Sequence, residues 1–255
     1  MTRALGVIPA RYASTRFPGK VLHPLCGKPL IQWVWERACQ AQLLDEVRVA
    51  TDDERVAQVV TDFGGRACLT WADHPSGTDR VAEVAAATAA DIVVNVQGDE
   101  PLIAPELIDA LVAALAETGG AWDMATAAAP ITDDAVLAAP SVVKVVCDQA
   151  GAALYFSRSV IPHVREKDGV QPVDGLYWRH IGVYGYRRDF LERLVATAPC
   201  ALEQAEKLEQ LRALYRGARI KVIATTHRAL GVDEPSDVAM AEEALRAVGL
   251  DESPQ

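Results

Sequence analysis

The segment Ile92-Val93-Val94-Asn95-Val96 is apolar at nearly every position, and it constrains the fold of the 255-residue chain more than any other feature. A strand without polar alternation is usually buried on both faces, in the middle of a parallel sheet. Other short apolar runs in the first half alternate with segments of helical periodicity. The predicted strands are residues 5–8, 47–50 and 67–69, and the predicted helices are residues 30–38, 54–63 and 78–89. This alternation predicts a mostly parallel, doubly wound α/β sheet that binds ligands at the carboxyl ends of its strands.

The second half of the chain has a different pattern. Two apolar runs flank Asp148-Gln149-Ala150-Gly151, which predicts an antiparallel hairpin. Further strands are predicted at residues 181–186 and 220–224, a surface loop at 169–175, and helices at 202–215 and 235–248, the first with Leu208, Leu211 and Tyr215 on one stripe. We expect a single domain over residues 1–255, with a mixed sheet and an antiparallel insertion at about residues 125–190.

Composition and charge exclude several classes of function. Half of the residues are hydrophobic, which suits a globular protein with a full core. The formal net charge of −10 argues against a nucleic-acid surface, which needs a basic face, although local basic clusters can still hold small anions. No apolar run is long enough to cross a bilayer, and Pro9, Arg11 and Arg16 end the first run too early for a signal peptide. We therefore expect a cytoplasmic protein without a membrane or nucleic-acid partner.

The cysteines and histidines show no pattern of a metal or disulfide site. The five cysteines are scattered, odd in number and without C-x-x-C spacing, and the five histidines form no H-x-x-x-H pair. Buried free thiols are the expectation for such cysteines.

The first predicted strand runs into a loop rich in groups that bind phosphate. Residues 9–20 read Pro-Ala-Arg-Tyr-Ala-Ser-Thr-Arg-Phe-Pro-Gly-Lys. Arginine pairs bidentately with phosphate oxygens, lysine supplies a compact charge for leaving pyrophosphate, and backbone N–H groups near Gly19 add neutral donors. The loop matches neither a Walker A motif nor a Rossmann fingerprint. From composition alone, a solvated basic loop between a strand and a helix is an equal alternative.

The whole string resembles the opening of a known enzyme family. Residues 8–11 (Ile-Pro-Ala-Arg), 14–20 and 27–30 (Gly-Lys-Pro-Leu) resemble the sugar nucleotidyltransferases, and among them the CMP-Kdo synthetases, or 3-deoxy-manno-octulosonate cytidylyltransferases. Further matching strings follow in order at residues 49–53, 73–80, 94–101, 155–158, 180–187, 208–212 and 231–235. This set distinguishes the family from sialic-acid cytidylyltransferases. Two departures are residues 228–230, where the family usually has a glycine-rich approach, and Asp79, where Glu is common.

The resemblance implies a fold like that of the nucleotide-diphospho-sugar transferases and a set of residues that contact CTP. The implied CTP-binding residues are Pro9, Ala10, Arg11, Ser14, Thr15, Arg16, Lys20, Ser76, Gly77, Thr78 and Gln97. Within this set, residues 76–78 resemble the segment that reads cytosine. Arg11 and Lys20, with Arg16 in support, are expected to stabilise charge on the phosphates during catalysis.

Asp99 and Asp233 are the implied ligands of a magnesium ion, and Asp99 is also an implied catalytic residue. Magnesium prefers a few carboxylates together with water and phosphate oxygens, so two acids from distant parts of the chain would suit it if they met at one sheet edge. The residues alone leave alternatives open. Asp99 is equally a turn or cap residue, and Asp233 is better explained as the N-cap of the last helix.

The implied contacts to the acidic sugar Kdo supply cationic and polar groups. They are Arg80, Gln97, Arg158, His180, Tyr184 and Glu209. Each has a structural alternative: a surface arginine for Arg158, a satisfied strand histidine for His180, and an i,i+4 ion pair for Glu209. Tyr184 alternates with Tyr186, so that one of the two is expected to face the core.

The activity implied by the resemblance is transfer of CMP from CTP to the anomeric hydroxyl of Kdo, which gives CMP-Kdo and pyrophosphate for lipopolysaccharide assembly. Such an in-line displacement needs positioning and charge neutralisation more than covalent catalysis. The resemblance also implies a homodimer, with the antiparallel insertion as a candidate interface. Alternatives are the same chemistry on 8-amino-Kdo or a sialic acid, a non-catalytic nucleotide-binding regulator, and an interaction scaffold. The intact cations and acids argue against the regulator, and the lack of repeats argues against the scaffold.

Overall fold

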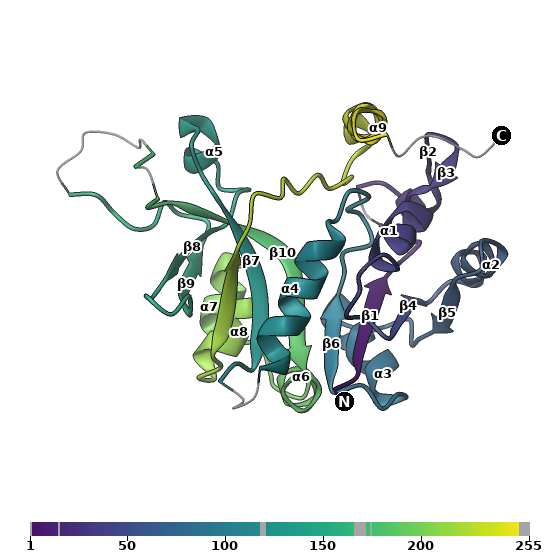
Figure 1. Ribbon diagram of the computed structural model, residues 1–255, viewed down its shortest axis with the longest axis horizontal. Helices are drawn as coiled ribbons and strands as arrows, with labels where there is room; N and C mark the ends of the chain where they lie inside the picture. Colours follow the sequence, from purple (N-terminus) through teal and green to yellow (C-terminus); the bar gives the residue numbers. More distant parts are fainter. Residues whose placement is uncertain (1, 15, 118–120, 166–171, 174, 250–255) are drawn as a thin grey trace. The chain divides into compact units, whose positions relative to one another are not determined.

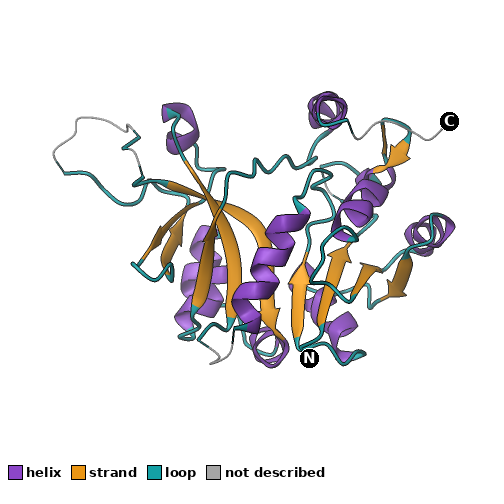
Figure 2. Cartoon of the chain, viewed as in Figure 1, coloured by secondary structure: helices purple, strands orange, loops and turns teal. Residues whose placement is uncertain are grey.

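The computed structural model describes residues 2–14, 16–117, 121–165, 172–173 and 175–249 (Figure 1). The chain divides into two compact units, residues 1–109 with 229–255, and residues 110–228. Helices and strands alternate in both units (Figure 2), and helix α4 (Pro105–Ala116) runs through the boundary between the two ranges. Within the described residues, no helix combines the length and apolar character that crossing a membrane requires.

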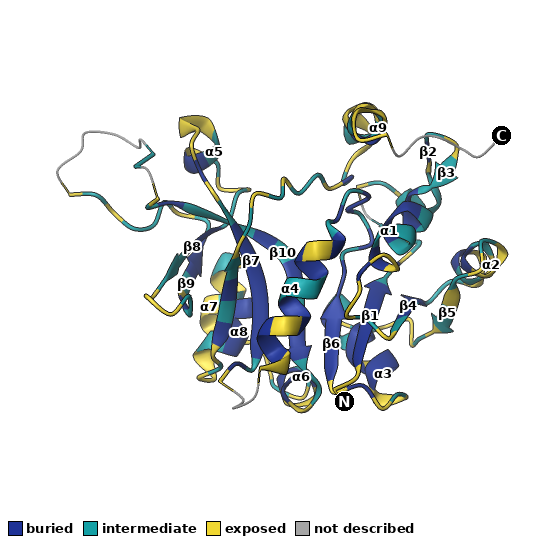
Figure 3. Cartoon of the chain, viewed as in Figure 1, coloured by how far each residue is buried: buried dark blue, intermediate teal, exposed yellow. Residues whose placement is uncertain are grey.

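The first unit is built on four parallel strands in the order β6-β1-β4-β5. Their bounds are Ala4–Pro9 for β1, Glu46–Thr51 for β4, Arg66–Leu69 for β5 and Ile92–Asn95 for β6. The helices of this unit are α1 (Leu30–Ala38), α2 (Glu54–Asp62), α3 (Gly77–Ala86) and α9 (Val238–Ala247). Every residue of β6 is buried (Figure 3), which confirms the prediction of a strand covered on both faces.

Three smaller elements complete the first unit. They are the 3-10 helices η1 (Lys20–Leu22) and η2 (Pro235–Asp237), and a two-stranded antiparallel pair of β2 (Pro24–Leu25) and β3 (Lys28–Pro29).

Helix α9 packs against the amino-terminal part of its own unit. Ala241 and Leu245 of this helix belong to a buried cluster that includes Leu25, Leu30 and Trp33. Val232, just before the helix, is part of the same cluster, and its backbone N–H donates to the carbonyl oxygen of Asp99 at 2.8 Å. Hydrophobic burial therefore holds residues 231–235 beside the carboxyl end of β6, although the two segments are far apart in sequence.

In the second unit, β7 (Met124–Pro130) pairs in parallel with β11 (Ile220–Ala224) and antiparallel with β10 (Trp178–Arg187). Strand β8 (Lys144–Cys147) pairs antiparallel with both β10 and β9 (Ala153–Ser157). The helices are α5 (Asp134–Ala138), α6 (Arg188–Val195), α7 (Ala201–Glu206) and α8 (Gln210–Tyr215). These pairings confirm the predicted mixed, mostly parallel α/β class with antiparallel strands. The single domain over residues 1–255 with its antiparallel insertion stays a prediction. The structure divides the chain into the two compact units given above.

The helix predicted at residues 202–215 is wrong as one element, because the chain breaks at Lys207. That residue is left-handed, with φ of 54°, and it separates α7 from α8. In a continuous helix the carbonyl of Glu206 would accept a bond from residue 210. It instead accepts Nε of Arg158 at 2.7 Å. Tyr215 is 63% exposed and leaves the buried stripe of Leu208 and Leu211.

The five cysteines are free, as predicted, but the expectation that they are buried holds only for Cys200. Cys39 is exposed because it lies just after the end of α1. The surface loop expected at residues 169–175 falls largely outside the described residues.

Gly98 lies where β1 and β6 end, and the space there admits only glycine. A Cβ atom at this position would lie 2.6 Å from the carbonyl oxygen of Pro9. We expect Gly98→Ala to destabilise the protein by about 1–3 kcal/mol, since the contact is with backbone rather than with a flexible side chain. Urea unfolding measures the change. Gly182→Ala is the matched control, because its Cβ would meet no described atom within 4 Å. Equal stability of the two variants would contradict this prediction.

Candidate active site

A pocket of about 350 Å³ opens in the first unit where β1 and β6 end. Nine of the residues singled out in the sequence line it, namely Pro9, Arg11, Ser14, Arg16, Lys20, Gly77, Gln97, Asp99 and Asp233. Ala10 and Thr78 are buried, and Thr15 lies outside the described residues. The pocket thus combines three cationic side chains with two carboxylates at the carboxyl ends of parallel strands, the usual ligand position of such sheets.

The loop of residues 9–20 is closed by its own backbone. The carbonyl of Tyr12 accepts hydrogen bonds from the N–H groups of Ser14 at 3.0 Å and Gly19 at 2.8 Å. Gly19 has φ of 73°, a left-handed conformation that glycine adopts without strain. The guanidinium of Arg55 stacks 3.5 Å from the centre of the Tyr12 ring. These contacts keep the loop compact and lead the chain into η1, whose first residue is Lys20.

Lys20 joins the two acids that the sequence singled out as metal ligands. Its Nζ donates to Asp99 Oδ2 at 2.7 Å, to Asp233 Oδ1 at 3.1 Å and to the carbonyl of Val232 at 3.1 Å. The three donors of the ammonium group are therefore all used. Arg16 Nη2 also lies 2.9 Å from Asp233 Oδ1. Asp99 and Asp233 thus converge on one cation position, and the metal site that the resemblance implies there stays a prediction.

The acids also change the acidity of the lysine. The side chain of Lys20 is only 13% exposed, and burial by itself lowers its pKa. The carboxylates of Asp99 and Asp233 outweigh burial, so that the pKa of Lys20 is raised above its usual value of 10.5. The lysine is a fixed positive charge over the whole physiological range.

Asp233 does not cap the last helix, which was the alternative that the sequence favoured. Glu234 caps η2, and Oδ2 of Asp237 accepts the backbone N–H groups of Asp233 and Glu234, both at 2.9 Å. Because Asp237 satisfies these amides, the Asp233 carboxylate is available to Lys20 and Arg16.

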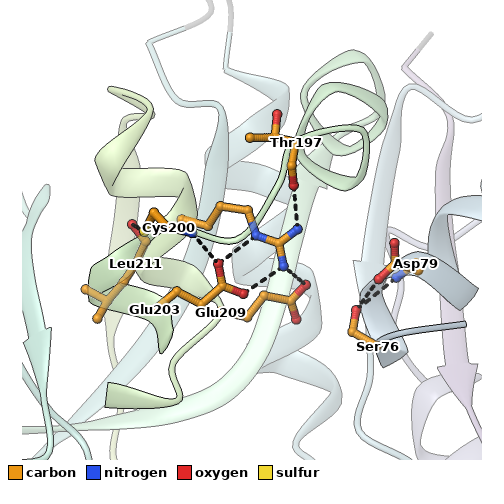
Figure 4. Close-up of polar contacts among 8 residues, drawn as sticks. Ser76, Asp79, Thr197, Cys200, Glu203, Glu209 and Leu211 are labelled. Carbon is orange, nitrogen blue, oxygen red and sulfur yellow. Dashed lines mark hydrogen bonds and ion pairs between the residues drawn. The ribbon is translucent and has the colours of Figure 1, made fainter. Parts of the chain in front are cut away.

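Ser76, Gly77 and Thr78 form the amino-terminal end of α3. Ser76 Oγ accepts the Asp79 N–H at 3.2 Å and donates to Asp79 Oδ2 at 2.6 Å (Figure 4). Asp79, one of the two departures from the family pattern, therefore shares in the N-terminal cap. Gly77 lines the pocket against the ring of Pro9, so the cap fixes one wall of this pocket.

Arg80 is fully buried, unlike a residue that meets a ligand at an open surface. Its Nη1 donates to the hydroxyl of Thr70, and its Nη2 lies 3.4 Å from Asp52 Oδ2. Burial lowers the pKa of Arg80, partly offset by Asp52. The predicted sugar contact of Arg80 stays a prediction, and what the structure shows is a link between α3 and the end of β4.

Apart from Gln97, which lines the pocket of the first unit, the other predicted sugar-binding residues lie in the second unit and are tied to neighbours. Arg158 donates through Nε to the Glu206 carbonyl at 2.7 Å and through Nη1 to the Pro140 carbonyl at 3.1 Å. Its backbone N–H donates to Glu206 Oε2 at 3.0 Å, and its carbonyl accepts from the buried Lys144 at 2.7 Å. Arg158 is therefore a fixed residue and not a free surface arginine.

Glu209 is held by a buried arginine. Arg212 makes a bidentate ion pair with Glu203, through Nε at 2.9 Å and Nη2 at 2.8 Å, and Nη2 also lies 3.4 Å from Glu209 Oε1 (Figure 4). Its Nη1 donates to the Thr197 carbonyl at 3.0 Å. The i,i+3 pair from Glu209 to Arg212 resembles the ordinary helix pairing expected as the alternative, and it fixes where the carboxylate points.

His180 and Tyr184 lie side by side on β10, with ring centres 5.4 Å apart. Burial lowers the pKa of His180 to about 3, so the ring is neutral at physiological pH. Burial, and then Glu209, raise the pKa of Tyr184, so its hydroxyl stays protonated. Tyr186, at 2% exposed, is the more buried of the two tyrosines, and the two rings lie on the same face of β10 with centres 6.1 Å apart.

Sequence reasoning missed several residues that support these groups. Val232 contributes a backbone carbonyl to Lys20, and Glu206 and Lys144 anchor Arg158. Only the glycine within Gln97-Gly98-Asp99 carried a readable signal, because a glycine between a buried strand and an acid indicates close backbone approach. A carbonyl contact and a buried lysine have no signature in a single sequence.

Comparison with known proteins gives one consistent group of relatives. The profile of the family described as "Cytidylyltransferase" matches residues 5–220. A 3-deoxy-manno-octulosonate cytidylyltransferase from Geobacter sulfurreducens is 51% identical over 246 residues, covering 94% of this chain and 98% of the relative. Its counterpart from Pseudomonas fluorescens is 52% identical over 249 residues, covering 94% and 97%.

Solved structures agree with these sequences. A CMP:2-keto-3-deoxy-manno-octonic acid synthetase complexed with CTP has a TM-score of 0.89 at 44% identity, covering 98% of this chain and 100% of that one. A cytidylyltransferase from Leptospira borgpetersenii shares the fold, with a TM-score of 0.63 at 15% identity, covering 100% and 98%.

The pKa of Lys20 tests the contacts of the pocket without any ligand. We expect Asp99→Asn to lower this pKa more than Asp233→Asn, since Asp99 makes the shorter contact. Titration of the lysine Cε signal by ¹³C NMR measures it. Because the folded-state pKa of Lys20 is raised, these ion contacts stabilise the fold below pH 10.5 as long as the two carboxylates are ionised, and they are lost as the pH rises through the folded-state value. An unchanged Lys20 pKa in both variants would contradict the arrangement.

Proposed function

Because this chain belongs to the cytidylyltransferases, and among them to the 3-deoxy-manno-octulosonate cytidylyltransferase family, we propose that it transfers CMP from CTP to the anomeric hydroxyl of Kdo. The products are CMP-Kdo and pyrophosphate. The near full-length similarity to named relatives and the likeness to a synthetase complexed with CTP support this substrate pair. The observation that carries the proposal is the convergence of Lys20, Asp99 and Asp233 at the phosphate pocket.

The pocket suits a triphosphate because its cations have different environments. Arg11 is exposed at the pocket wall, where its guanidinium can pair with phosphate oxygens. Arg16 and Lys20 are already paired with acids, so they can exchange these partners for phosphate oxygens when nucleotide binds. Three cationic side chains thus oppose the charge of CTP on a chain whose net charge is −10.

The reaction is a displacement at the α-phosphorus. The anomeric oxygen of the sugar forms a bond to this phosphorus, and the bond to the bridging oxygen of the β-phosphate breaks. The electron pair leaves with pyrophosphate, and the hydroxyl proton passes to solvent or to a phosphate oxygen. Arg11 and Lys20 stabilise the charge that builds on the phosphates during this step.

We further propose that Asp99 and Asp233 hold a magnesium ion. Both carboxylates approach a single ammonium nitrogen, so they already face one cation position. Among the described residues no cluster of three His, Cys, Asp or Glu side chains could hold a metal ion, which leaves water and phosphate oxygens as the remaining ligands. When bound, magnesium would neutralise and orient the triphosphate.

Kdo carries one carboxylate and several hydroxyl groups, and the second unit offers groups of matching chemistry. Arg158 is a cation, while His180, Tyr184 and Glu209 can exchange hydrogen bonds with hydroxyl groups. By family resemblance we also assign sugar contacts to Gln97 and Arg80 of the first unit. A panel with Kdo, 8-amino-Kdo and a sialic acid separates the alternative sugars. By family resemblance we also propose a cytoplasmic homodimer whose product serves lipopolysaccharide assembly.

Pyrophosphate release is the direct test of the activity. We expect pyrophosphate release only when CTP, magnesium and Kdo are all present. A nucleotide-binding regulator would bind CTP but would release no pyrophosphate. Lys20→Ala should lower kcat about a hundredfold or more, because such a charged donor is worth about 3–4 kcal/mol in the transition state. Arg193→Ala is the control, since this exposed arginine contacts Asp189 and the Phe190 ring of its own helix α6 and does not line the pocket. Full turnover by Lys20→Ala would refute the assigned role.

The metal assignment is tested at Asp99. The isosteric Asp99→Asn variant keeps a hydrogen-bond acceptor for Lys20 but loses the negative charge that magnesium needs. We expect activity and its dependence on magnesium concentration to be lost together. Titration calorimetry with magnesium and a non-hydrolysable CTP analogue should show weakened binding. Asp189→Asn, on the exposed face of α6, is the matched control. Wild-type turnover in Asp99→Asn would mean that the metal is held elsewhere.

A further inference from the structure

Thr126 lies on β7 opposite an irregularity in β10. Ala127 pairs with Ile181, but the next residue, Thr126, pairs with Tyr184. Between these two steps β10 inserts Gly182 and Val183, which have no partner of their own on β7. Thr126 is fully buried beneath this bulge. Its hydroxyl therefore lies where the backbone of β10 cannot make regular ladder bonds.

The hydroxyl of Thr126 has three close polar neighbours. Its Oγ1 lies 2.8 Å from the carbonyl of Val183, 3.2 Å from the carbonyl of Ile181 and 3.0 Å from Nε2 of His180. A carbonyl oxygen can only accept a hydrogen bond, and a hydroxyl has one proton to give. That proton must point to the carbonyls, because otherwise lone pairs would face one another at 2.8 Å. The bond to His180 is then donated by the ring, from Nε2–H.

This assignment fixes the state of the other ring nitrogen. The His180 pKa of about 3 keeps the ring neutral, so a proton on Nε2 leaves Nδ1 bare. Within the described part of the chain, Nδ1 has no hydrogen-bond partner. The ring is also restrained by neighbours, with Phe156 edge-on at 5.0 Å and Tyr184 at 5.4 Å between ring centres. His180 is thus half satisfied, and its open half is an acceptor.

We propose that Thr126 is a positioning residue that fixes His180 as the Nε2–H tautomer, so that Nδ1 accepts a hydrogen bond from a hydroxyl group of the acidic sugar. The proposal rests on the proposed function, which gives His180 a sugar to bind. The opposite tautomer would present an N–H to the same hydroxyl and would require a different hydrogen-bond direction. Thr126 therefore contributes to sugar specificity without touching the substrate.

The tautomer can be measured without any activity. In protein with ¹⁵N-labelled histidine, the ring nitrogen shifts report which atom carries the proton, and loss of signals in His180→Gln assigns them. We expect wild type and Thr126→Ser to show a single Nε2–H form. Thr126→Val, which has no hydroxyl, should show a mixture or the Nδ1–H form. An Nδ1–H ring in wild type would overturn the proposal, and this measurement needs no folded valine variant.

Kinetics then test the consequence for the sugar. Thr126→Val should raise KM for Kdo about tenfold or more while KM for CTP changes little, and Thr126→Ser should restore the wild-type value. The matched control is Thr61→Val on α2, where an exposed threonine donates only to the Ala57 carbonyl at 2.9 Å. An unchanged KM for Kdo in Thr126→Val, with an active wild type, overturns the inference. Failure of wild type to release pyrophosphate would refute the proposed function instead, since the NMR result stands apart from turnover.

Discussion

The first unit depends on the contacts that the ammonium group of Lys20 makes with Asp99, Asp233 and the Val232 carbonyl. Asp99 and Asp233 would repel each other at such close range, and a shared cation removes that repulsion. The same group ties the end of the loop of residues 9–20 to residues 231–235, which precede α9. The backbone hydrogen bond from Val232 to Asp99 holds the same junction together. The proposed polyphosphate site is thereby assembled in advance from two carboxylates and three cations, which leaves one positive charge in excess before any ligand arrives.

Preorganisation in the second unit is achieved differently. Arg158 is fixed by backbone carbonyls and by Glu206, while Glu209 is fixed by Arg212, whose charge is already matched by Glu203. His180 is fixed by the hydroxyl of Thr126. Arg158, Glu209 and His180 thus each have a partner that restricts the motion of the side chain, so little conformational entropy would be lost if they bind a ligand.

The strand–helix alternation was predictable because each element of the first half has an unbroken hydrophobic period, as in Ile92–Asn95. Arg11 and Lys20, which line the pocket, stood out by their chemistry, but composition alone left a solvated basic loop as an equal alternative, and the family resemblance decided between the two. What failed were features decided by tertiary contacts. At the break marked by Lys207, the carbonyl of Glu206 accepts a hydrogen bond from Arg158 in place of a helical one. Helical periodicity in the sequence gives no sign of such a contact. The sequence favoured Asp233 as a cap, but the carboxylate that accepts the backbone N–H groups there belongs to Asp237, and the metal-ligand role of Asp233 stays a prediction.

The junction of residues 231–235 with the first strands also sets an order of events during synthesis. A ribosome delivers the loop of residues 9–20 and β6 long before α9, yet the buried cluster of Leu25, Leu30 and Trp33 needs Ala241 and Leu245 for its cover. Until those residues emerge, the nascent chain lacks Asp233, one of the two carboxylates of the pocket. It also leaves the apolar surface of the buried cluster exposed. The pocket is therefore complete only after Asp233 has been synthesised, long after the loop of residues 9–20 that forms another part of its lining.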